Sequence, residues 1–142
     1  MDFEKCSNIS CDQIILVKEN KSSFRINNKS KYKVSTVTVD GCLIDDARTR
    51  CDYLFEIGIP VISVRYVELK GSDIEKAYKQ LGATVGYCRE HYAKLPSLSQ
   101  SCYIVASRVP RSGPKTQELK KKFAKAFDIQ LIIKTNSCEI TV

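Results

Sequence analysis

VISVRYVELK, residues 61–70, is the stretch of sequence that decides the fold. The run is long, largely apolar and rich in β-branched residues, which predicts a strand that ends at Gly71. A second run of the same kind, CDYLFEI at residues 51–57, precedes it, and a Gly-Ile-Pro turn at residues 58–60 separates the two. A connection this short predicts that the two strands are antiparallel neighbours.

A helix is predicted directly after this pair of strands. Ser72 is expected to cap the helix, and Glu75 completes a capping box with it. The helix is expected to end near His91. Its apolar residues fall on one stripe, which consists of Ile74, Ala77, Tyr78, Leu81 and Val85.

Further elements are expected on both sides of this unit. Upstream, three segments rich in β-branched residues predict a hairpin and a third strand: Gln13–Lys18, Ser23–Asn27 and Tyr32–Asp40. Downstream, a strand, a helix, a strand and a short terminal strand are predicted at Ser101–Arg108, Lys115–Phe127, Ile129–Lys134 and Glu139–Val142. This order predicts an α/β fold with a mixed central β-sheet flanked by helices and with an N-terminal β-hairpin. The length of 142 residues predicts a single domain, residues 1–142.

The charge of the chain favours a polyanionic partner. Lys and Arg number 23 against 16 Asp and Glu, which gives a net charge of +7. Nucleic acid is the commonest partner of such a chain, although charge alone is equally compatible with a basic, solvated surface. No apolar run approaches membrane-spanning length, and the polar N-terminal residues lack the apolar stretch of a signal peptide.

The cysteines predict a reducing, cytoplasmic environment. There are seven of them, with no C-x-x-C pair, and His91 is the single histidine, so zinc-ligand spacing is absent. Several free thiols suit the cytosol. Cys42 and Cys102 lie in apolar runs and are expected to be small core residues.

Two carboxylates and an ammonium group form the candidate catalytic set. Glu68 and Lys70 are two apart on one predicted strand, so their side chains point to the same face. Asp52 starts the preceding strand, and pairing about the turn places it roughly opposite residues 66–68. Two carboxylates can hold Mg²⁺, which polarises a phosphoryl oxygen and acidifies a water, while the lysine orients that water. The alternative is a surface salt bridge at a strand edge, which the apolar character of the strand disfavours.

These residues resemble a known nuclease superfamily. Asp52 in CDYLFEI, Glu68 and Lys70 in VELKG, and Gln80 in AYKQL are similar to the PD-(D/E)xK, or restriction-endonuclease-like, superfamily. The resemblance implies a Mg²⁺-dependent nuclease in which Mn²⁺ can substitute, with DNA favoured over RNA. It also implies that Asp52, Glu68 and the backbone carbonyl of Leu69 hold the metal. Lys70 would then activate the water, and Gln80 would line the site.

The resemblance covers roughly residues 34–133, with departures. Cys51 stands where the superfamily motif has Pro, and Thr84 stands where RecB-type members have Tyr. The subfamily therefore stays open. So does a second hypothesis, a catalytically inactive module of the same fold that binds nucleic acid or a partner protein. Homodimerisation or association with a partner subunit is compatible with either hypothesis.

Substrate contacts are expected from a loop and from the last helix. The candidate nucleic-acid-binding residues are Arg108, Arg111, Lys115, Lys121 and Lys122. A solvated helix face explains the three lysines equally well. No recognition helix is evident, so binding is expected to involve backbone phosphates and to depend strongly on salt.

Three other polar residues have side chains of the kind that act in catalysis. Asp45 and Asp46 lie in a predicted loop, residues 43–50, beside two arginines, and are interpreted as solvated turn residues. His91 is interpreted as a polar surface residue rather than a general base.

Overall fold

The computed structural model describes residues 1–70, 73–95, 97–108 and 114–142. The chain forms nine strands and two helices in these ranges. The strands are β1 (Ser7–Ser10), β2 (Ile14–Glu19), β3 (Ser22–Asn27), β4 (Val34–Thr38), β5 (Tyr53–Ile57), β6 (Ser63–Lys70), β7 (Ser99–Ala106), β8 (Gln130–Thr135) and β9 (Ser137–Thr141). The helices are α1 (Ile74–Tyr92) and α2 (Pro114–Phe127).

The predicted α/β architecture with a mixed sheet is confirmed. The larger sheet has six strands in the order β1-β4-β5-β6-β7-β8, and the smaller sheet has the order β2-β3-β9. In the larger sheet β4, β5 and β6 are antiparallel neighbours, whereas β7 and β8 run parallel to β6. The β6 strand is therefore an interior strand that is hydrogen-bonded on both sides.

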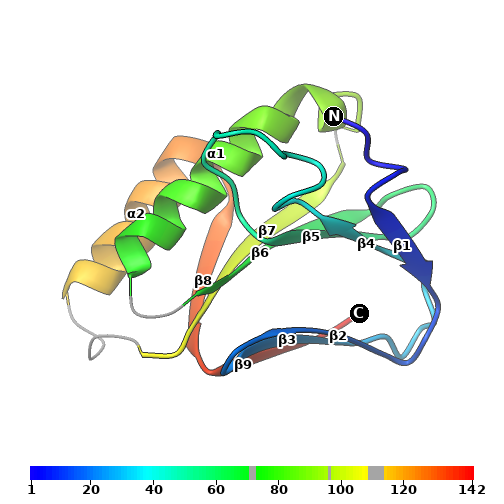
Figure 1. The fold of residues 1–142 in the computed structure, drawn as a ribbon, viewed down its shortest axis with the longest axis horizontal. Helices are drawn as coiled ribbons and strands as arrows, with labels where there is room; N and C mark the ends of the chain where they lie inside the picture. Colours follow the sequence, from blue (N-terminus) through cyan, green and yellow to red (C-terminus); the bar gives the residue numbers. More distant parts are fainter. Residues whose placement is uncertain (71–72, 96, 109–113) are drawn as a thin grey trace.

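The layers differ from the prediction, because both helices cover the same face of the larger sheet. Figure 1 shows α1 and α2 side by side above this sheet, with the small β2-β3-β9 sheet beneath it. On β6, Val64 and Tyr66 belong to the core under the helices, while Val67 and Leu69 belong to the core shared with the small sheet. Since β6 is apolar on both faces, each face needs a covering layer, and the small sheet supplies the second one.

The small sheet joins the two ends of the chain. Its β2–β3 hairpin was predicted and forms with Glu19 opposite Ser22. The parallel pairing of β9 with β3 was not predicted, nor was β1, which pairs antiparallel with β4. Neither pairing has a local sequence signal, because the partners are far apart along the chain.

The start of α1 also differs from the prediction. Asp73 is the N-cap, and its side chain accepts a 3.0 Å hydrogen bond from the backbone N–H of Lys76. Ser72 lies outside the described residues, so its capping box with Glu75 stays a prediction; Glu75 forms a 2.7 Å ion pair with Lys115. An aspartate cap provides the same acceptor as a serine and adds a negative charge at the positive end of the helix dipole.

The cysteines are used in two ways. Cys102 is fully buried, as predicted, whereas Cys42 is only partly buried against the core and forms a disulfide with Cys6, which was not predicted. This disulfide connects the segment before β1 to the loop after β4. Within the described residues, neither helix is long and apolar enough to cross a membrane.

Candidate functional site

Asp52 lies directly before β5, and Glu68 lies near the end of the neighbouring β6. Tyr53 pairs with Val67 in the antiparallel ladder, so the next pair along the two strands is Asp52 and Glu68. The Oδ2 atom of Asp52 accepts a 2.8 Å hydrogen bond from the backbone N–H of Leu69. Residues opposite each other in such a ladder have Cβ atoms about 4.5–5.5 Å apart, which lets two carboxylates share one cation.

The backbone of Asp52 is fixed from the other side as well. Its carbonyl oxygen accepts hydrogen bonds from the N–H groups of Val39 at 3.0 Å and Asp40 at 3.2 Å. The residue is thus held between the end of β4 and the end of β6. This double attachment sets the position of the carboxylate before any ligand binds.

Both carboxylates are removed from bulk water. Asp52 is 9% exposed and Glu68 is 0% exposed. Strand alternation puts Glu68 on the same face as Tyr66, towards the helices. Burial of carboxylates is costly for folding, and such groups concentrate at functional sites.

The two carboxylates also affect the pKa of the neighbouring Cys51 thiol. The pKa of Cys51 is raised well above its ordinary value, first by complete burial and then by the charges of Glu68 and Asp52, while its interaction with Thr84 acts in the opposite direction. Because both carboxylates act on one thiol, they share one buried region. The thiol itself is kept neutral there and is not a candidate nucleophile.

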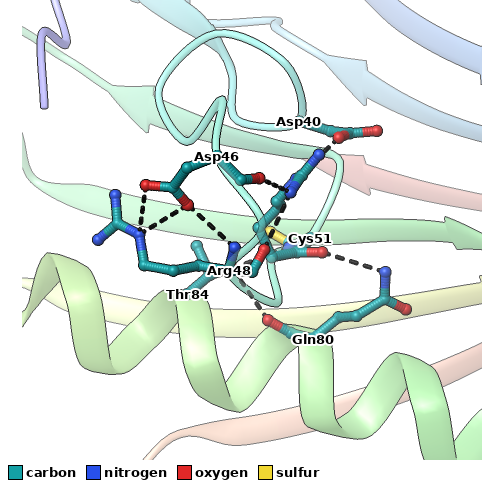
Figure 2. Close-up of polar contacts among 7 residues, drawn as sticks. Asp40, Asp46, Arg48, Cys51, Gln80 and Thr84 are labelled. Atoms are coloured by element: carbon teal, nitrogen blue, oxygen red, sulfur yellow. Dashed lines mark hydrogen bonds and ion pairs between the residues drawn. The ribbon is translucent and has the colours of Figure 1, made fainter.

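Two side chains of α1 anchor the segment that leads into Asp52. Gln80 Nε2 donates a 3.1 Å hydrogen bond to the carbonyl oxygen of Arg50, and Thr84 Oγ1 accepts one of 2.8 Å from the N–H of Cys51. Thr84 Oγ1 also donates to the Gln80 carbonyl oxygen, at 2.9 Å. Figure 2 shows both side chains reaching from α1 towards this segment. The described side-chain contact of Gln80 is therefore with the backbone two residues before Asp52, and its role in lining the carboxylate site stays a prediction.

The anchoring role of Thr84 was missed in the sequence, although a signal exists. Thr84 follows Gln80 by one helical turn, so both side chains lie on the same face of α1. Tyr87 continues this face and has the Arg48 guanidinium 4.9 Å above its ring centroid. A polar stripe of this kind on a helix that covers a sheet indicates a second segment packed against it.

The loop between β4 and β5 is held by its own charged residues. Arg50 Nε forms a 2.9 Å ion pair with Asp40, and Arg48 Nε forms one of 3.0 Å with Asp46. Arg50 Nη1 also donates to the carbonyl oxygens of Asp46 and Arg48. Hydrogen bonds from the Arg48 side chain and backbone lower the pKa of Asp46. Asp45 and Asp46 are exposed, which agrees with their interpretation as solvated turn residues.

Lys70 is the last residue of β6 and pairs with Ala106 of β7. Its side chain lies outside the described part of the chain, so its role towards the water stays a prediction. The role of the Leu69 carbonyl as a metal ligand also stays a prediction, since the described contact of Leu69 is made by its N–H group.

The predicted nucleic-acid-binding residues lie after β7 and on α2. Arg108 is exposed just after β7, Lys121 and Lys122 are exposed on α2, and Arg111 lies outside the described residues. Lys115 is paired with Glu75 across the two helices, and hydrogen bonding to that glutamate raises the lysine pKa. Their role in binding nucleic acid stays a prediction.

His91 lies at the far end of α1. Its ring stacks on Phe3 with centroids 3.7 Å apart, and its Nε2 is 4.0 Å from a carboxylate oxygen of Glu56. This packing suits the interpretation of His91 as a surface residue with a structural contact rather than a general base.

Oxygen donors at Asp52 and Glu68 fit a hard divalent cation. Among the described residues, no group of three or more His, Cys, Asp and Glu side chains surrounds a common point. Mg²⁺ nevertheless needs only one or two protein carboxylates, because waters and substrate phosphates complete its shell. The donor set therefore fits Mg²⁺ or Mn²⁺ and not the nitrogen- and sulfur-rich shell of zinc.

The chain was compared with protein-family models, with curated proteins and with solved structures, and nothing matched in any of the three comparisons.

Proposed function

We propose that the chain is a Mg²⁺-dependent nuclease that hydrolyses phosphodiester bonds, with DNA the favoured substrate. The observation that carries the proposal is the position of Asp52, one residue beyond the Tyr53–Val67 pair and so beside Glu68, with its carboxylate hydrogen-bonded to the Leu69 N–H. A buried interior strand has no structural need for a carboxylate at this position. Catalytic metal chemistry does need one.

The arrangement of elements supports the restriction-endonuclease-like core expected from the sequence resemblance. An acidic residue directly precedes β5, an E-x-K triplet ends the neighbouring β6, and α1 follows with Gln80 bonded to the segment that leads into Asp52. In such a site Asp52 and Glu68 hold the metal, and Lys70 orients the attacking water. When bound, Mg²⁺ polarises the phosphoryl oxygen and lowers the pKa of a bound water.

The test is cleavage of end-labelled oligonucleotides by the full chain. Single-stranded, duplex and branched DNA and RNA are incubated with Mg²⁺, with Mn²⁺ or with EDTA. We expect metal-dependent cleavage that falls at least about a hundredfold in Glu68→Gln, Asp52→Asn and Lys70→Gln. Glu90→Gln is the matched control, because Glu90 is an exposed glutamate on α1. Full cleavage by the Glu68→Gln protein would exclude the proposed mechanism.

A second candidate function is a non-catalytic module that binds nucleic acid. The observation that favours it is the burial of both carboxylates, since Glu68 is 0% exposed and a substrate has to reach the metal. Such a module would bind oligonucleotides in a salt-dependent manner and release no product with either metal. The same cleavage assay therefore separates the two functions.

A further inference from the structure

A cationic pocket lies beside the carboxylate pair. It has a volume of about 520 Å³ and is formed between the loop before β5 and the first half of α1. Its lining consists of Asp40, Ala47, Arg48, Thr49, Arg50, Lys76, Lys79 and Gln80. The volume suits one nucleotide-sized group and is too small for a duplex.

Only some of the charged side chains in this pocket form ion pairs within the protein. Four cationic side chains and one carboxylate line it. Arg48 and Arg50 are ion-paired and shape the loop. Lys76 and Lys79 are exposed, and neither has an ion pair within the part of the chain that the structure describes. Two lysine ammonium groups are thus available for an anion, and phosphate is the anion that lysine binds most readily as a point charge.

Gln80 adds a requirement that a simple anion does not meet. The residue is 9% exposed, and its Nε2 is used by the Arg50 carbonyl oxygen. Its Oε1 is buried and has no hydrogen-bond partner among the described residues. A buried acceptor needs a donor, so the matching ligand carries an N–H or O–H group as well as a negative charge. A nucleotide has both.

The pocket adjoins the carboxylates through the chain itself. Arg50 precedes Asp52 by two residues, and two extended residues span at most about 7 Å. A strand whose scissile phosphate lay at Asp52 and Glu68 would therefore bring a neighbouring nucleotide to the pocket.

We propose that this pocket, with Lys76, Lys79 and Gln80 as its contact residues, binds a nucleotide adjacent to the scissile phosphate in a single nucleic-acid strand. This proposal rests on the proposed nuclease function, whose substrate site it extends. Lys76 and Lys79 each bind one of the two phosphates that flank this nucleotide, and Gln80 Oε1 accepts a hydrogen bond from the sugar or base. The pocket selects a single strand, so duplex substrates have to be frayed or unpaired at the cleavage point.

The test measures binding of a fluorescein-labelled single-stranded oligonucleotide to the full chain by anisotropy, in Ca²⁺ and at several salt concentrations. The pocket variant is Lys76→Gln with Lys79→Gln. The control is Lys18→Gln with Lys21→Gln, which removes the same charge from exposed positions of the β2–β3 hairpin. We expect roughly tenfold weaker binding by the pocket variant and a salt slope smaller by about 1.4, from two phosphate contacts on a single strand. The control should keep the wild-type slope.

Three results would overturn the pocket. The first is a pocket variant whose affinity depends on salt as steeply as that of the wild type. The second is an equal loss of affinity in the control variant. The third is an absence of oligonucleotide binding by the wild-type chain. Equal competition by inorganic phosphate and by a nucleoside monophosphate would overturn the nucleotide assignment. Unchanged thermal midpoints of both variants exclude unfolding as the cause.

The two proposals fail separately. If the wild-type chain binds in a Lys76- and Lys79-dependent manner but cleaves nothing in Mg²⁺ or Mn²⁺, hydrolysis is excluded and the pocket stands. If the wild-type chain cleaves and the pocket variant has the same KM and salt slope, the pocket is excluded and the nuclease stands.

Discussion

The two faces of the six-stranded sheet are built for different purposes. The core on the face towards the small sheet is aromatic and aliphatic, and the Phe24 ring in it contacts the rings of both Phe55 and Tyr103. The core on the face towards the helices is interrupted by buried polar side chains, among them Glu68 and Thr84. The first face gains free energy from apolar burial, whereas the second gives up part of that gain.

This contrast shows where function is to be sought. Glu68 is 0% exposed, yet an apolar residue could fill such a buried position. Its neighbours Val67 and Leu69 do so on the opposite face of the same strand. Replacing buried charged groups by apolar residues is often neutral or stabilising. Stability therefore does not explain Glu68, and this favours the proposed metal-dependent chemistry.

The largest expected effect is a loss of stability from the face towards the small sheet. Phe55 is fully buried, and its ring centroid is 5.4 Å from that of Phe24. Phe55→Ala should lower the free energy of unfolding by about 3–5 kcal/mol, measured by urea denaturation followed by circular dichroism. Ile9→Ala, at a residue that is 55% exposed, should change it by less than about 0.5 kcal/mol. A loss below about 1 kcal/mol at Phe55 would mean that this face is not the stabilising one.

The next effect concerns the metal and belongs to the face towards the helices. At a Mn²⁺ concentration a hundredfold above its Kd, the wild-type free energy of unfolding should rise by about 2.7 kcal/mol. Glu68→Gln should abolish this rise, because it removes one of the two carboxylate ligands, and Glu90→Gln should retain it. Differential scanning calorimetry with and without Mn²⁺ measures the effect. An equal rise in the Glu68→Gln protein would place the metal elsewhere.

Thr84 connects the two kinds of effect. Thr84→Val keeps the side-chain shape but leaves the buried Cys51 N–H without its 2.8 Å partner. We expect a loss of about 1–3 kcal/mol in the free energy of unfolding, together with weaker Mn²⁺ binding, because Asp52 follows the released residue. Thr141→Val on the exposed side of β9 is the matched control. Lost stability with unchanged Mn²⁺ affinity would show that Thr84 supports the fold and not the site.

The central part of the fold could be predicted from the sequence because its signals are local. The apolar run before Lys70 and the short turn at residues 58–60 together define the antiparallel β5–β6 pair, and the observed register sets Asp52 against Glu68. The position of the small sheet could not be predicted in this way. It depends on the pairing of β3 with β9, which lie more than a hundred residues apart.

The surroundings of the site also could not be predicted from local sequence patterns. The pocket arises where Lys76 and Lys79 of α1 meet a loop with no regular structure of its own. Arg48 and Arg50 were visible in the sequence only as loop charges. Their ion pairs with Asp46 and Asp40 and the anchoring by Gln80 appear only once the loop is folded against the helix.

The smallest expected effect compares buried thiols on the two faces at high pH. Burial raises the pKa of Cys88, on the helix side, to about 12, and the charge of Glu56 adds to this rise. Burial also raises the pKa of Cys138 on β9, but the nearby Lys134 opposes that rise. A raised folded-state pKa means that the unfolded chain loses its proton first. The stability contribution is therefore complete below about pH 9 and is lost as the pH rises towards 12.

Each such thiol can steepen the fall of the free energy of unfolding by up to about 1.4 kcal/mol per pH unit. Cys88→Ala should therefore flatten this fall above pH 9, and Cys138→Ala should flatten it less, because a neighbouring lysine favours the Cys138 thiolate already in the folded chain. Urea denaturation at a series of alkaline pH values measures both slopes. The slope is the informative quantity, since the small cavity left by either alanine lowers stability equally at every pH. A larger flattening for Cys138→Ala than for Cys88→Ala would contradict the assignment of the more strongly desolvated core to the helix side of the sheet.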